Sequence, residues 1–102
     1  DPALAEPLEL QRVLAQGAVG LDVLALQNRL AYLGYAVDAD GVYGPSTWRA
    51  VRQFRHDNGL ALSFVADAEF AAALNGQVEA ALAAEAERDV QLEKAIELLT
   101  AR

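Results

Sequence analysis

The chain has 102 residues, a hydrophobic fraction of 54% and a formal net charge of −7. This length suits one small domain with short extensions, and the hydrophobic fraction argues for a packed core rather than a disordered chain. The acidic charge argues against nucleic acid as a partner, because phosphate binding needs clustered Lys and Arg. No run of about 18 apolar residues is present, so no membrane span is predicted.

Cysteine is absent, which excludes disulfides, thiol catalysis and cysteine-based zinc sites. The chain begins at Asp1 and contains no methionine, so we expect it to be part of a longer protein. Residues 1–16 contain two prolines and no clean helical period. They are predicted to form a linker with room for a short helix.

Three helices are predicted within residues 17–76, and the first covers about 22–33. Its buried face is indicated by apolar residues that step by 3, 4 and 3: Val23, Leu26, Leu30 and Leu33. Asp22 suits the first turn, where an acidic group interacts favourably with the helix dipole. Gly34 suits a left-handed C-terminal cap.

The second helix is predicted to begin with Gly44 as its cap and Pro45 at its first position, and to end at Asn58-Gly59. The third helix is predicted to begin after Asp67 and to end near Asn75-Gly76. The inward residues of these two helices are expected to be Ala50, Val51, Phe54, Phe70, Ala71 and Leu74.

Residues 77–102 are helical by composition and carry a second apolar stripe at Leu92, Ile96 and Leu99. Asp89 is expected to cap a separate final helix. The stripe needs a partner, which can be the rest of the protein or, through the 89–101 helix, a second copy. The predicted fold is therefore all-α, a small three-helix domain at 17–76 with a C-terminal helical extension.

Many residues of the 17–76 segment resemble, at their fixed spacings, the type 1 peptidoglycan-binding domain. The matching residues are Gly20, Val23, Leu26-Gln27, Leu30, Leu33-Gly34-Tyr35, Asp40-Gly41, Tyr43-Gly44-Pro45, Thr47, Ala50-Val51, Phe54 and Gly59-Leu60. The family usually has Asp-Gly before its final helix, where this chain has Ser63-Phe64-Val65 followed by Asp67. Binding residues of that loop are therefore not carried over.

Residues 89–99, DVQLEKAIELL, resemble the C-terminal ending of the carboxy-terminal processing proteases. Those are extracytoplasmic serine proteases with a Ser–Lys dyad, and some carry a peptidoglycan-binding domain before that ending. The resemblance implies that a protease domain precedes this chain and is one of its partners. It also implies a location in the bacterial cell envelope or periplasm.

The loop around residues 38–47 is expected to be a turn rather than a metal site. With Gly41 at the sixth position of a calcium loop, the first and twelfth positions fall on Ala36 and Thr47, which are poor ligands. Asp40-Gly41 is favoured turn chemistry, so Asp40 and Thr47 are expected to shape the fold before they touch any ligand. Zinc is not predicted either, since His56 is the only histidine, and no cofactor is expected.

Three arginines, Arg49, Arg52 and Arg55, fall on one short stretch after this loop. On a helix, Trp48 shares a face with Arg52 and Arg55, at positions i+4 and i+7. Two interpretations stay open: a cation–π contact without function, or a platform for a disaccharide beside arginines that bind the carboxylates of a peptide stem.

Tyr35 and Tyr43 flank the loop, and partly exposed aromatic faces of this kind stack on sugars and peptides. The predicted ligand-binding residues are therefore Tyr35, Asp40, Tyr43, Thr47, Trp48, Arg52 and Arg55.

No catalytic group is predicted, because neither Ser46 nor Ser63 lies in a nucleophile-elbow motif and Lys94 lies on the tail. The expected function is non-catalytic binding of peptidoglycan glycan or peptide stems, which localises an attached enzyme. The alternative is a structural or regulatory protein–protein module of that enzyme without wall binding.

Overall fold

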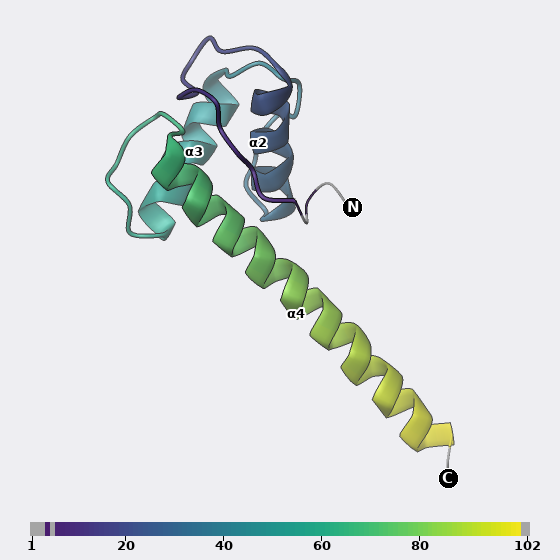
Figure 1. Cartoon of the computed structure of the whole chain (residues 1–102). Coiled ribbons are helices and arrows are strands. Elements are labelled where there is room, and N and C mark those ends of the chain that lie inside the picture. Colours follow the sequence, from purple (N-terminus) through teal and green to yellow (C-terminus); the bar gives the residue numbers. More distant parts are fainter. Residues whose placement is uncertain (1–3, 5, 101–102) are drawn as a thin grey trace.

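The computed structural model describes residue 4 and residues 6–100, with side chains described as far as residue 86. Its three long helices are α2 (Leu21–Tyr32), α3 (Pro45–Asp57) and α4 (Ala68–Thr100). Figure 1 shows α2 and α3 beside the first turns of α4, while the rest of α4 projects away from them. Among the described residues, β structure is limited to two isolated antiparallel bridges, Leu14 with Ala66 and Val19 with Val42. The predicted all-α fold is confirmed.

One hydrophobic core joins the three helices. Phe54 of α3 and Phe70 of α4 meet edge to face, with ring centroids 5.0 Å apart. The inward residues predicted from the helical spacing are confirmed, because Val23, Leu26, Leu30, Ala50, Val51, Phe54, Phe70, Ala71 and Leu74 are all buried. Leu33, also predicted to face inward, packs only partly against this core.

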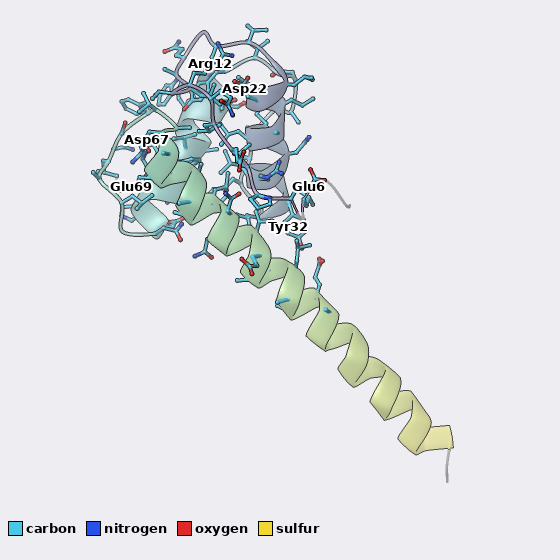
Figure 2. The ribbon with its side chains drawn as sticks, viewed as in Figure 1. Glu6, Arg12, Asp22, Tyr32, Asp67 and Glu69 are labelled. Carbon is cyan, nitrogen blue, oxygen red and sulfur yellow. The ribbon has the colours of Figure 1, made fainter. Side chains whose placement is uncertain are left out.

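The predicted helix ends are mostly confirmed by backbone geometry. Gly34 and Gly59 have positive φ values of 98° and 70°, a conformation that other residues rarely adopt. Pro45 occupies the start of α3 after Gly44, where its missing N–H costs nothing. Asp67 Oδ1 accepts a hydrogen bond of 2.9 Å from Phe70 N and so caps α4, at whose start Figure 2 places it.

The predicted end of the third helix at Asn75-Gly76 is wrong, and so is the separate final helix beginning at Asp89. The α4 backbone continues through both places to Thr100. Gly76 is not among the described glycines with positive φ, so it does not form a left-handed cap. A single glycine costs a helix only about 1 kcal/mol relative to alanine, and the alanine-rich residues around it favour continuation.

Residues 6–14 run along the helices and contribute to the same core. Leu8 and Leu14 are 7% and 0% exposed. Leu8 N donates to Asn75 Oδ1 at 2.7 Å, and Asn75 Nδ2 donates back to Leu8 O at 3.0 Å. Leu14 and Ala66 exchange two backbone hydrogen bonds of 2.9 and 2.8 Å. The start of the chain is therefore attached to α4 and to the loop before it.

An ion pair joins the first segment to the beginning of α2. Arg12 Nε lies 2.9 Å from Asp22 Oδ2, and Arg12 Nη2 also donates to Val19 O at 2.9 Å. Figure 2 shows Arg12 and Asp22 close together. The hydrogen bond from Arg12 holds the pKa of Asp22 below its usual value.

Candidate functional site

The turn at residues 40–47 is built around the side chain of Gln27, which is 0% exposed. Its Nε2 lies 3.2 Å from Asp40 Oδ1, 2.9 Å from Val42 O and 2.9 Å from Thr47 Oγ1. Its Oε1 accepts a bond of 2.8 Å from Gly41 N. One amide thus connects α2, the turn and α3. This network agrees with the expectation that Asp40 and Thr47 shape the fold first.

Asp40 also closes the turn itself. Its Oδ1 accepts a bond of 3.0 Å from Val42 N, the pattern of an Asx turn, and Gly41 has a φ of 78°. The bond from Val42 N, followed by that from Gln27, holds the pKa of Asp40 below its usual value. Asp40 remains exposed, whereas Thr47 is 0% exposed. A direct contact of Thr47 with ligand, as predicted, is therefore not available in this structure.

Tyr43, expected to present a partly exposed ring, is only 1% exposed. Its hydroxyl donates a hydrogen bond to Phe64 O, and burial raises its pKa above the usual value. The expectation of a partly exposed face is wrong, because the hydroxyl finds its partner in the 61–65 loop and the ring fills the core. The position of Tyr43 beside the Asp40-Gly41 turn does not reveal that the 61–65 loop binds its hydroxyl.

Arg55 is also buried, at 3% exposure, and the prediction that it forms part of an accessible face is wrong. Its Nε and Nη2 donate to Val65 O at 3.1 and 2.9 Å, and its Nη1 donates to Ala61 O at 3.2 Å. Its Nη2 also lies 3.2 Å from Asp67 Oδ1. Arg55 therefore holds the loop between α3 and α4, and the loop covers it.

An open groove of about 460 Å³ lies between α3 and the chain that follows α2. It is lined by Tyr35, Ala36, Val37, Asp38, Ser46, Arg49, Ala50 and Gln53. Ser46 Oγ accepts a bond of 3.0 Å from Asp38 N, which ties the two walls together. The groove therefore offers hydroxyl, amide, carboxylate and guanidinium groups beside one aromatic ring.

Tyr35 is the predicted aromatic residue that does line this groove. Its hydroxyl donates a bond of 2.7 Å to Asp57 Oδ2. Burial and this hydrogen bond raise the pKa of Tyr35 to about 12, so it stays neutral at physiological pH. Asp57 Oδ1 also accepts a bond of 2.8 Å from Gln53 Nε2. The Asp57 carboxylate therefore links two residues of the groove, Tyr35 and Gln53.

Next to the groove around α3 lies a second surface, here called the aromatic–arginine face and made of Trp48, Arg49, Arg52 and Phe64. Trp48 and Phe64 pack edge to face, with ring centroids 4.9 Å apart and planes at 80°. The Cζ atoms of Arg49 and Arg52 lie 5.6 Å from the Trp48 ring and 5.9 Å from the Phe64 ring. The prediction that Trp48 pairs with Arg52 and Arg55 is wrong. Arg52 lies over Phe64 and Arg55 lies over Phe70, while Arg49 lies over Trp48.

Arg49 connects the two surfaces, since it lines the groove and also lies over Trp48. The sequence interpretation missed Arg49, Gln53 and Phe64 as site residues. Arg49 could have been found from the helical spacing, which places it between Trp48 and Gln53 around α3. Phe64 could not, because it comes from the loop that departs from the family pattern.

Among the described residues, no group of three or more His, Cys, Asp or Glu side chains is placed to hold a metal ion. In the same part of the chain, no helix combines the length and apolarity needed to cross a membrane. The accessible chemistry of the site consists of hydrogen-bonding groups, aromatic rings and two arginines.

Curated relatives of this chain are spore cortex-lytic enzymes. The enzyme of Oceanobacillus iheyensis is 46% identical over 56 residues, which cover 54% of this chain and 20% of that enzyme. The enzyme of Bacillus subtilis is 50% identical over 50 residues, or 48% of this chain and 16% of that enzyme. The chain therefore matches only a fifth or less of the length of these two enzymes.

Solved structures show the same arrangement of helices. The SleB N-terminal domain superposes with a TM-score of 0.65 and 36% identity, covering 68% of this chain and 96% of that chain. A peptidoglycan-binding protein from Clostridioides difficile, solved in complex with glutamine hydroxamate, gives a TM-score of 0.64 and 30% identity. That match covers 66% of this chain and 42% of that protein.

Residues 19–74 match the family described as "Putative peptidoglycan binding domain". The matched segment contains α2, the turn around Gln27, α3, the loop held by Arg55 and the first turns of α4. It spans more than half of the 102 residues. The chain belongs to the peptidoglycan-binding domain family.

Proposed function

We propose that this chain binds bacterial peptidoglycan without catalysing a reaction and thereby holds an attached enzyme at its substrate. The observation that carries the proposal is the accessible surface of α3, where Arg49 joins an open groove to an aromatic–arginine face in a member of this family. The relatives, which are named as cortex-lytic enzymes, support the same proposal.

The chemistry of this surface suits a glycopeptide. Peptide stems of peptidoglycan carry carboxylates, which guanidinium groups such as those of Arg49 and Arg52 bind with two parallel hydrogen bonds. The groove offers Ser46 and Gln53 to amides and hydroxyls, and Tyr35 offers a ring for an apolar contact. On a chain of net charge −7, these neighbouring exposed arginines provide a local site for an anionic stem.

The attached enzyme is proposed to be one that acts in the cell wall or spore cortex, outside the cytoplasm. The curated relatives favour a lytic enzyme over the carboxy-terminal processing protease that residues 89–99 resemble. The side chains of residues 89–99 lie outside the described part of the structure, so the protease partner and the self-association through the 89–101 helix stay predictions.

Co-sedimentation with purified insoluble peptidoglycan tests the proposal. We expect the parent chain to pellet at modest salt, and Arg49→Ala, Arg52→Ala double variants to remain in solution. Arg12→Ala is the control for lost positive charge, because Arg12 is exposed and lies in the segment before α2, where it pairs with Asp22 rather than with the α3 surface. Trp48→Ala with Arg52→Ala tests the aromatic part of the same surface.

Each outcome has a distinct meaning. Equal pelleting of the parent and both double variants would place binding elsewhere on the domain. A parent chain that stays in solution would refute wall binding. The protein–protein interaction module would then be the better account, and the projecting part of α4, seen in Figure 1, is the feature that favours it.

A further inference from the structure

The loop between α3 and α4 presents a phenylalanine ring to solvent. Phe64 is 50% exposed, although burial of a phenylalanine side chain stabilises a fold. Leu62, in the same loop, is 59% exposed. Exposed apolar side chains that cluster on one loop mark an interaction surface more often than isolated ones do.

The backbone around Phe64 is held by groups from the protein interior. Phe64 O accepts from the hydroxyl of Tyr43, and Val65 O accepts two bonds from Arg55. Both donors are almost fully buried, at 1% and 3% exposure. Ser63 Oγ also accepts a bond of 3.2 Å from Val65 N. The ring is therefore presented from a fixed backbone, and a preorganised contact loses less conformational entropy on binding.

The neighbours of Phe64 define what this surface can bind. The edge-to-face pair with Trp48 and the guanidinium of Arg52 cover only part of Phe64, which remains 50% exposed. Arg52 lies over Phe64 and Arg49 over Trp48, so two guanidinium groups border the aromatic pair. Rings for an apolar sugar face and guanidinium groups for a carboxylate lie side by side.

We propose that Phe64 and Trp48 form the stacking surface for a sugar ring of a peptidoglycan disaccharide–peptide, while Arg52 binds a carboxylate of its peptide stem. This inference rests on the proposed function and names the ligand groups that the aromatic–arginine face takes. It assigns a sugar-contact role to the loop at 63–65, which differs from the usual Asp-Gly sequence of the family.

Calorimetric titration of the chain with three soluble fragments tests this assignment: a disaccharide–peptide, the disaccharide alone and the peptide alone. Phe64→Leu keeps an apolar side chain but removes the ring, so we expect about three- to tenfold weaker binding of both sugar-containing fragments. Phe64→Tyr restores the ring and is expected to bind like the parent. Arg52→Ala is expected to weaken binding of both peptide-containing fragments and to spare the disaccharide.

Unchanged binding of the disaccharide–peptide by Phe64→Leu would overturn the stacking role and leave the proposed function intact. Equal losses in Phe64→Leu and Phe64→Tyr would overturn it too, because the aromatic ring would then not be the cause. A parent that pellets with intact peptidoglycan yet binds no fragment would refute this inference alone. A parent that neither pellets nor binds a fragment would refute the inference and the proposed function together.

Discussion

Replacing Gln27 by methionine is expected to destabilise the domain strongly, although methionine has nearly the same size and shape. The substitution removes the amide that donates to Thr47 Oγ1 and Val42 O and accepts from Gly41 N. Thr47 is 0% exposed, so water cannot replace the hydrogen bond that its hydroxyl receives from Gln27. An unsatisfied buried polar group costs about 1–3 kcal/mol, and the partly buried groups of the turn bring the expected total to about 2–4 kcal/mol.

Urea unfolding followed by the fluorescence of Trp48, the only tryptophan, measures this loss. With an m-value of about 1–3 kcal/mol/M for a small domain, the midpoint should fall by about 0.7–4 M. Asn28→Met is the matched control, because Asn28 is the exposed neighbour of Gln27 on α2 and its replacement should stay within about 0.5 kcal/mol.

A double variant, Gln27→Met with Thr47→Val, isolates the reason for the loss. Replacing both partners by apolar groups removes the orphaned hydroxyl, so the two substitutions together should cost less than the sum of each alone. If the two losses simply add, or if Gln27→Met alone costs less than about 0.5 kcal/mol, the network does not hold the turn as reasoned.

Other consequences of the structure can be measured in the same way. Leu14→Ala should cost about 2–5 kcal/mol in urea unfolding, despite the prediction of a linker over 1–16, because Leu14 is 0% exposed; a loss below about 0.5 kcal/mol would contradict this packing. Asp67→Ala should cost at least about 1 kcal/mol, because it removes the α4 cap and the carboxylate beside the buried Arg55, whereas Asp67→Asn should retain most of the capping bond. Tyr43→Phe should cost about 0.5–1.5 kcal/mol, since it removes the bond to the loop carbonyl without opening a cavity. The pKa values of Asp22, Asp40 and Asp67 are lowered in the fold, so their stabilising contribution is complete above about pH 4 and is lost as the pH falls through the folded-state pKa values; unfolding midpoints that stay level from pH 6 to 3 would refute it.

Features that depend only on neighbouring residues could be predicted from the sequence. Asp40-Gly41 predicted a turn, Pro45 predicted the start of a helix, and Gly34 and Gly59 predicted helix ends, because each requirement concerns φ values or bonds within a few residues. The apolar spacing in each helix also predicted the buried faces, since helix geometry assigns side chains to faces directly.

Which residues of a helical face remain accessible depends on the tertiary packing and could not be predicted in this way. Arg52 and Arg55 share a helical face with Trp48, yet Arg52 is exposed and Arg55 is 3% exposed. The difference arises from the loop at 61–67, whose carbonyls and carboxylate surround one guanidinium. Helical spacing specifies direction around an axis, but burial depends on the chain that packs against that side, which can be distant in sequence.

The same reason explains the length of α4 and the packing of the first segment. Asn75-Gly76 suits a helix end locally. Strong helix formers follow Gly76, however, and they favour continuation of the helix over termination at the glycine. Asn75 instead bonds the backbone of Leu8, which lies 67 positions earlier. A contact across that separation cannot be predicted from helical spacing, because the spacing relates only residues within the same helix.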